Sequence, residues 1–150
     1  PEQALALGVP RGPLWSTLQG GETVTLEDGR TVRPEDVLGP PRMGRKFSFV
    51  TDTTYASSIS REVAGSDLLI CEGMFAHELE DSAREKKHLT AVQVATIARD
   101  AGGVKRMGLI HYSPRYTERE LKLLLRESRE LFPDTFLCRD GQTLPVPYED

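Results

Sequence analysis

Residues 107–116 read Met-Gly-Leu-Ile-His-Tyr-Ser-Pro-Arg-Tyr, an apolar run of strand length that ends in a histidine and a turn. Two earlier runs, Phe47–Val50 and Leu68–Cys71, are similar, and an acidic residue follows each of them within two positions. We interpret all three as buried strands, with Phe136–Cys138 as a weaker candidate. Because amphipathic helical patterns separate these runs, the sequence predicts an α/β sheet covered by helices.

Two of the helical patterns in this region begin with a recognisable N-terminal capping motif. Residues 90–93 and 117–120 both read as capping boxes, in which a Thr and a Gln or Glu three positions later pair with free N–H groups of the first turn. A shorter helix is predicted over residues 54–64, with Ile59 and Val63 on one face.

The beginning of the chain has a different character. Residues 1–21 are rich in Gly and Pro, which predicts a compact irregular segment. Thr23–Leu26 and Arg30–Val32 flank Asp28-Gly29, a dipeptide typical of the turn in a β-hairpin. The composition changes after Gly44, where the strand and helix patterns begin.

The composition is that of a soluble globular protein, with 38% apolar and 28% charged residues. The apolar runs are much shorter than the roughly 18–20 residues that span a bilayer, so no membrane association is expected. The chain begins with Pro1 rather than Met, and no signal peptide is recognised. We therefore expect a processed chain or a piece of a longer one. The net charge of −4 argues against bulk electrostatic binding of nucleic acid, but it allows a local basic patch.

The two cysteines, Cys71 and Cys138, stand in apolar strand-like runs. We expect reduced thiols in a cytoplasmic protein rather than a disulfide. Their spacing excludes a zinc site of the CxxC type.

Titratable residues follow the predicted strands. Asp52, Glu72 and His111 stand at or just beyond the ends of three strands, and His88 precedes the capped helix at Thr90. Loops at the carboxyl edge of an open α/β sheet carry its reactive groups, so these four side chains predict a metal or acid–base site. The alternative is ordinary structure, in which Asp52 caps a helix, Glu72 belongs to a solvated turn and His88 is a surface residue.

The order of these motifs resembles the C-terminal half of ribonuclease Z, the transfer-RNA 3′-processing endonuclease of the metallo-β-lactamase fold. The match rests on Asp52-Thr53 after a strand, Glu72 at the end of the next, the run 88–90 (His-Leu-Thr) and the run 111–116 (His-Tyr-Ser-Pro-Arg-Tyr). Gly8-Val9-Pro10-Arg11-Gly12-Pro13 also fits the glycine- and proline-rich motif of that family's exosite arm, which grips transfer RNA. The resemblance extends from Leu7 to about Val146.

The resemblance implies the C-terminal half of a metallo-β-lactamase αββα sandwich (residues 43–150), preceded by part of the exosite arm (residues 1–42). It implies two zinc ions per complete site, with manganese or iron as alternatives, bridged by Asp52 and ligated by His111. Glu72 and His88 would form the pair that shuttles a proton to the leaving 3′ oxygen. The residues implied in substrate binding are Ser113, Arg115, Gly8, Pro10, Gly12 and Pro13.

The implied activity is removal of 3′ trailers from transfer-RNA precursors by attack of a metal-bound hydroxide on a phosphodiester. The family's first metal motif, His-x-His-x-Asp-His, is not in this chain, so we expect the isolated chain to be nearly inactive. The implied partners are a transfer-RNA precursor and the N-terminal half of the same fold. Without that half, a sheet edge or face is exposed, so we also expect self-association into a homodimer or another homo-oligomer. The alternatives are another metal-dependent hydrolase of this fold, or a non-catalytic RNA-binding or interaction module.

The sequence departs from the family pattern at two site positions. Thr51 stands where the family usually has Gly before the bridging Asp, and Cys71 stands where it usually has His before the Glu. The second departure removes a side chain next to the proposed proton shuttle.

Overall fold

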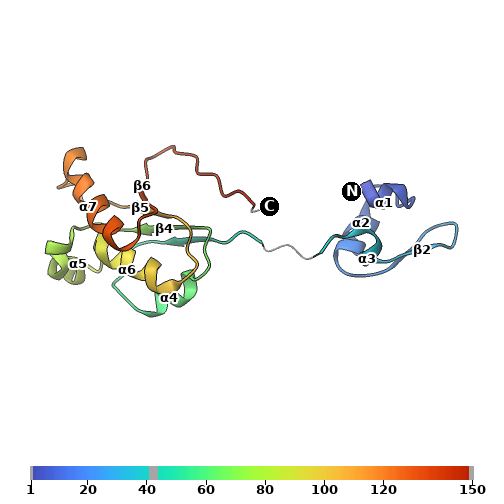
Figure 1. The fold of residues 1–150 in the computed structure, drawn as a ribbon, viewed down its shortest axis with the longest axis horizontal. Helices are drawn as coiled ribbons and strands as arrows, with labels where there is room; N and C mark the ends of the chain where they lie inside the picture. The colour runs from blue at the N-terminus through green and yellow to red at the C-terminus, as the bar shows by residue number, and fades with distance from the viewer. Residues whose placement is uncertain (1, 41–43, 149–150) are drawn as a thin grey trace. The chain divides into compact units, whose positions relative to one another are not determined.

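The computed structural model describes residues 2–40 and 44–148. The chain divides into two compact units, Pro1–Met43 and Gly44–Asp150, and each has its own hydrophobic core (Figure 1). The predicted boundary between residues 42 and 43 lies outside the described residues.

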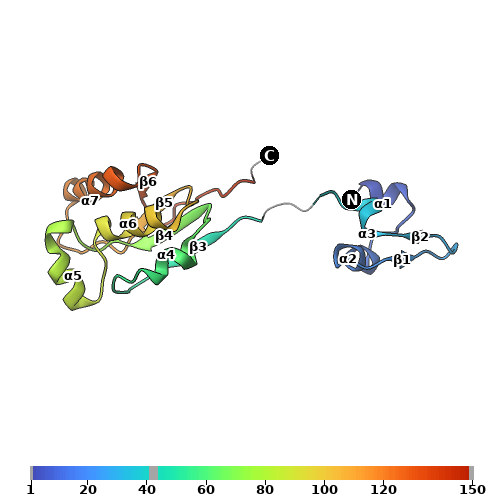
Figure 2. The same ribbon diagram turned by 60° about the horizontal axis from the view of Figure 1, so that its bottom comes forward.

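The first unit is a small helical cluster with a hairpin (Figure 2). Its elements are α1 (Glu2–Ala6), α2 (Pro13–Gln19), β1 (Val24–Thr25), β2 (Thr31–Val32) and α3 (Pro34–Val37). β1 and β2 pair antiparallel around Asp28-Gly29, as predicted. The side chains of Val9, Leu18, Val24 and Val32 form the core of this unit.

The prediction of an irregular segment over residues 1–21 is wrong, because α1 and α2 lie within it. The Gly and Pro residues stand at the helix ends instead. Gly8 follows α1 with a φ of 82°, a conformation that glycine adopts without strain. Pro13 is the first residue of α2, where the N–H that proline lacks would have no helical partner.

The second unit contains a four-stranded parallel sheet in the order β3-β4-β5-β6. Its strands are β3 (Phe47–Val50), β4 (Leu68–Glu72), β5 (Met107–Ile110) and β6 (Thr135–Leu137). Its helices are α4 (Ser58–Val63), η1 (His77–Leu79), α5 (Glu80–Lys86), α6 (Ala91–Ala101) and α7 (Glu118–Leu131). All four predicted strands are confirmed within a residue or so, and both capping boxes form as predicted.

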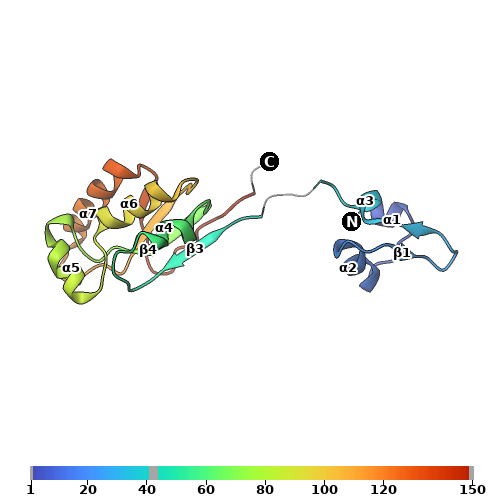
Figure 3. The same cartoon turned by 90° about the horizontal axis from the view of Figure 1, so that it is seen from below.

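The helices α4, α6 and α7 pack together on one face of the sheet, and Figure 3 shows α6 and α7 side by side above it. Leu69 and Cys71 of β4 and Leu109 of β5 belong to this core, whereas Ile70 points to the opposite face because side chains alternate along a strand. On that opposite face, the neighbours of Gly108 leave no room for a side chain. A Cβ there would lie 2.6 Å from the Ile70 Cδ1 atom.

The prediction that β3 is a buried strand is wrong. The side chains of Phe47 and Phe49 are 57% and 58% exposed, and their ring centroids lie 6.4 Å apart. β3 is an edge strand that pairs only with β4 in the described part of the chain. A short apolar run does not show whether anything covers it, so the pattern alone could not separate a central strand from an edge strand.

We expect this exposed pair to promote self-association of the chain, since an edge strand with a bare apolar face pairs readily with another chain. The double substitution Phe47→Ser and Phe49→Ser should raise the dissociation constant of any dimer about tenfold or more, because it removes roughly 2 kcal/mol of apolar burial. Sedimentation velocity over a concentration series measures this change. The control variant Leu38→Ser with Tyr55→Ser removes two other exposed apolar side chains and should leave association unchanged. A wild-type chain that stays monomeric throughout the series would contradict the prediction.

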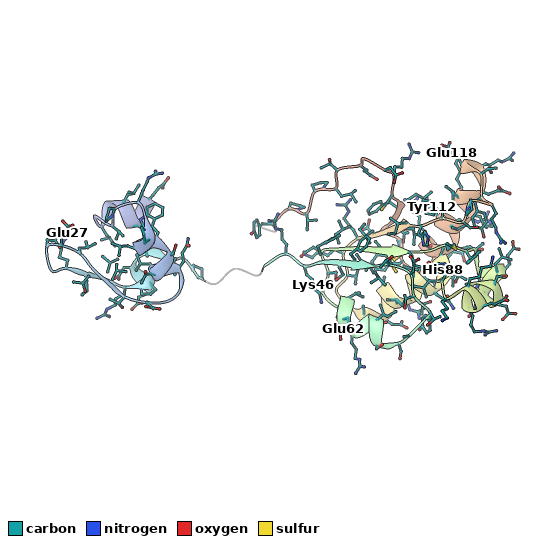
Figure 4. All side chains as sticks on the ribbon, turned by 180° about the vertical axis from the view of Figure 1, so that it is seen from behind. Glu27, Lys46, Glu62, His88, Tyr112 and Glu118 are labelled. Carbon is teal, nitrogen blue, oxygen red and sulfur yellow. The ribbon has the colours of Figure 1, made fainter. Side chains whose placement is uncertain are left out.

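At the amino edge of the sheet, two basic side chains donate hydrogen bonds to backbone carbonyl oxygens of other segments. Lys46, just before β3, donates from Nζ to the Glu62 and Ala64 carbonyl oxygens at 2.7 and 2.8 Å, and Figure 4 shows Lys46 beside Glu62. Arg45 donates to the Val146 carbonyl oxygen at 2.6 Å and thereby holds the C-terminal segment against this edge. The opposite, carboxyl edge is left for the loops that carry the titratable residues.

Both cysteines are free thiols, as predicted. Burial raises the pKa of the Cys71 thiol far above its usual range, so this group stays protonated. Across residues 2–40 and 44–148, no helix is long and apolar enough to cross a membrane.

Candidate metal centre

The predicted convergence of titratable side chains is confirmed at the carboxyl edge of the parallel sheet. Asp52 lies two residues beyond β3, Glu72 is the last residue of β4, and His111 directly follows β5. His88 lies in the connection between α5 and α6. Parallel strands end at the same edge, which is why residues from distant parts of the sequence meet there.

Asp52 and His111 face each other across this edge. The Nδ1 atom of His111 lies 3.2 Å from Oδ1 of Asp52, and the Thr51 hydroxyl donates to the same oxygen at 2.9 Å. The Thr51 hydroxyl, then the backbone N–H of Asp52 and then the neighbouring His111 and His88 hold the pKa of the Asp52 carboxyl below its usual range. Asp52 is therefore ionised at neutral pH, as a metal ligand must be.

Glu72 and His88 form a second pair that is buried. Glu72 is fully buried, and its Oε1 atom accepts the Thr53 N–H at 3.0 Å and lies 3.2 Å from Nδ1 of His88. This contact occupies Nδ1 of His88, whereas its Nε2 atom has no hydrogen bond among the described residues and can act as a metal ligand. The Oε2 atom of Glu72 is buried and has no hydrogen-bond partner among the described residues.

Three of these four side chains form a group that can hold a metal ion. Asp52, His88 and His111 each offer one ligand atom, and these atoms lie within 4.8 Å of one another. The imidazole rings of His88 and His111 lie edge to face, 5.1 Å apart. One carboxylate and two imidazoles match the donor types and the number of protein ligands of catalytic zinc sites. His88 thus belongs to this triad and also contacts Glu72.

Arg115, a predicted phosphate ligand, lies beside the site. Its guanidinium carbon is 5.2 Å from the centre of the Phe75 ring, which in turn lies 6.4 Å from the ring of His88. Ser113 is buried, and its N–H donates to the Met74 carbonyl oxygen at 3.1 Å. The predicted arm residues Gly8, Pro10, Gly12 and Pro13 all lie in the first unit, between α1 and the first turn of α2.

The structural alternatives for the site residues are wrong. Glu72 lies inside the protein rather than in a solvated turn, and only 15% of the His88 side chain is exposed. Asp52 does not cap a helix, because α4 begins after Ser57.

Sequence reasoning assigned no role to three residues beside this site. Thr51 and Thr53 supply hydrogen bonds to Asp52 and Glu72, and Phe75 lies between Arg115 and His88. The Asp-Thr dipeptide hinted at Thr53, but the contact runs through its backbone N–H, which every residue except proline carries.

No protein-family model matches this sequence. Curated relatives match over its full length: it is 59% identical to the ribonuclease Z of Treponema denticola and 56% identical to that of Treponema pallidum, in each case over 100% of this chain and 48% of the relative. The ribonuclease Z of Synechocystis is 42% identical over 97% of this chain and 45% of the relative. The chain therefore spans about half the length of the curated relatives it matches.

Two solved structures resemble the fold. The metallo-β-lactamase fold protein YhfI of Bacillus subtilis matches 64% of this chain and 38% of its own, with a TM-score of 0.58 and 21% identity. The short form of human tRNase Z matches 78% of this chain and 37% of its own, with a TM-score of 0.54 and 24% identity. The predicted fold class is thus confirmed, and so is the resemblance to the C-terminal half of ribonuclease Z. The donor group at the sheet edge agrees with the metal site that we expected there.

Proposed function

We propose that this chain is the C-terminal half of a zinc-dependent endoribonuclease that removes 3′ trailers from transfer-RNA precursors. One observation carries the proposal: Asp52, Glu72, His88 and His111 meet at one sheet edge, in the two pairs that the resemblance to ribonuclease Z implies. The 59% identity to the Treponema denticola ribonuclease Z supports it. Residues 1–42 would then be part of the exosite arm that grips the RNA. The complete enzyme would act in the cytoplasm.

Asp52 and His111 would hold the metal, and the lone pair on Nε2 of His88 makes this residue a third candidate ligand. When bound, zinc supplies positive charge that stabilises the negative charge developing on the phosphate oxygens. Manganese and iron accept the same donor types, so the choice of zinc rests on the resemblance to ribonuclease Z.

Glu72 acts through His88. A buried carboxylate that accepts from Nδ1 fixes the orientation of the imidazole and stabilises its protonated form. His88 can then give a proton from Nε2 to the 3′ oxygen when the bond from phosphorus to that oxygen breaks. If Nε2 instead ligates the metal, Glu72 orients the ligand, a carboxylate–histidine–metal arrangement common in zinc sites.

Arg115 and Ser113 would bind the phosphate at or next to the bond that is cut. The Arg115 guanidinium is exposed yet lies against Phe75, which contacts His88, so its planar donors are close to the site. A guanidinium binds two phosphate oxygens at once and so positions the group as well as neutralising it.

The buried carboxylate also weighs against a non-catalytic RNA-binding module. Glu72 has one oxygen without a hydrogen bond in the described part of the chain, and burying a carboxylate in this way lowers stability. A binding surface has no need of such a group, whereas a proton-transfer site does.

The direct test compares the chain alone with the chain joined to the missing half. We expect the isolated chain to leave a labelled transfer-RNA precursor uncut with added zinc, since Asp52, His88 and His111 cannot complete a two-zinc site. Adding the N-terminal half of the Treponema denticola ribonuclease Z should restore cleavage and raise the zinc content. Robust cleavage by the isolated chain, or a zinc-loaded pair of halves that does not cut, would overturn the proposal.

A further inference from the structure

A groove of about 730 Å³ runs between α7 and the strand β6 in the second unit. We call it the basic groove, because cationic side chains dominate its charge. Its charged and aromatic lining comprises Arg119, Lys122, Arg129, Arg139, Tyr112 and Phe136, with Glu118 as the acidic member. No role is assigned to this groove by the metal centre described above.

The cations of the basic groove are available to a ligand. Arg119, Lys122 and Arg139 form no ion pair with any residue that the structure describes. Arg129 donates from Nε to the Thr135 carbonyl oxygen at 2.8 Å, which fixes its position and leaves its terminal nitrogens. Four cations against one acid stand out in a chain with a net charge of −4, and such a concave surface attracts a polyanion.

The groove and the metal centre are linked through the loop that follows β5. Tyr112 lines the groove and directly follows His111 in the sequence. Figure 4 shows Tyr112 between Glu118, at one end of α7, and His88. The Tyr112 hydroxyl lies 2.5 Å from the Leu109 carbonyl oxygen, so the side chain is fixed to β5. Two consecutive residues of one loop, His111 and Tyr112, therefore belong to the metal centre and to the basic groove.

The wall of the groove on the α7 side is apolar, with Leu121 and Leu125 half-buried along it, and Tyr112 adds an aromatic side chain. The Phe136 ring itself lies on the other face of the sheet, against Gly108 and the Arg106 guanidinium. Proteins that bind single-stranded nucleic acid combine cations for the phosphates with apolar and aromatic surface for the bases. An acidic protein segment would use the cations but would have no reason to continue into the metal centre.

We infer that the basic groove binds single-stranded RNA adjoining the phosphodiester that is cut, with Arg119, Lys122 and Arg139 contacting its phosphates. The identity of the ligand as substrate RNA rests on the proposed function. The binding itself can be measured without cleavage.

Fluorescence anisotropy with a labelled oligouridylate tests this binding on the 150-residue chain. The variant Arg119→Ala with Lys122→Ala should bind about tenfold more weakly at 0.1 M salt. Its log–log salt slope should be less steep by about 1.4, since each phosphate contact of a single strand contributes about 0.7. The control variant Arg61→Ala with Arg126→Ala removes two other exposed helical cations without ion pairs, one of them also on α7. Circular dichroism verifies that both variants are folded.

Equal losses in the two variants would overturn the inference, because bulk charge alone would then explain binding. Competition by polyglutamate as effective as that by unlabelled oligouridylate would overturn the assignment to RNA. With both halves present, the groove variant should raise KM for a transfer-RNA precursor about tenfold while zinc content and kcat stay unchanged. If wild-type halves do not cut at all, the proposed function fails, while the oligouridylate comparison still decides whether the groove binds RNA.

Discussion

The substitution His111→Ala is expected to lower cleavage by the combined halves by about 10³-fold or more and to deplete their zinc. His111 lies 3.2 Å from Asp52 and is one of three side chains in the donor group. Catalytic zinc sites depend on about three protein ligands, so losing one removes much of the several kcal/mol that the metal contributes to the transition state. Elemental analysis of zinc and a single-turnover cleavage assay measure the two effects.

His77→Ala is the matched control for this experiment. His77 is an exposed histidine on η1, 3.7 Å from Glu80, and lies outside the donor group. Its replacement should leave zinc content and cleavage within about twofold of wild type, as for most surface substitutions. A His111→Ala protein that keeps both its zinc and its activity would remove His111 from the proposed mechanism.

The substitution Glu72→Gln is expected to lower kcat by about 10²–10⁴-fold, the usual contribution of a positioned acid or base. Gln keeps the shape of Glu72, and its amide oxygen can still accept the Thr53 N–H, so the fold should be retained. It loses the negative charge that supports the protonated form of His88. Glu78→Gln, the same change on η1, is the control.

The zinc content of Glu72→Gln separates the two roles of His88. Unchanged zinc with a lower kcat indicates that His88 carries the proton. A 10–100-fold loss of zinc affinity indicates that His88 is a ligand that Glu72 orients, the size of effect typical of such an orienting group. Unchanged zinc together with unchanged kcat would show that Glu72 takes no part in the reaction.

The arrangement of the second unit could be predicted because local and global signals agree there. The caps at Thr90 and Thr117 satisfy the first turn of each helix through neighbouring residues alone, so no tertiary information is needed. Parallel strands then bring Asp52, Glu72 and His111 to one edge whatever the loops do. The location of the candidate site follows from the residues, whereas the roles of its members come from the resemblance to ribonuclease Z.

The features that escaped prediction depend on contacts between distant segments. The exposure of Phe49 depends on what covers the sheet, and an apolar run carries no such information. The full burial of Glu72 depends on the loop after β3, which brings the Thr53 N–H over the end of β4. In the first unit, the Gly and Pro residues predict irregular structure although the segment is helical, because the same residues end helices and form loops.

At position 111, the backbone conformation disfavours histidine, whereas the metal centre requires its imidazole. The φ of 59° at His111 lies in the left-handed region, a conformation that costs about 1 kcal/mol or more for a residue with a Cβ. Asparagine is well tolerated in this region, but its short amide would not replace the imidazole beside Asp52. A search for thermal resistance alone would therefore discard this histidine. An engineer raising the melting temperature of the protein should leave position 111 untouched, because a residue that stabilises the backbone there would remove the imidazole beside Asp52.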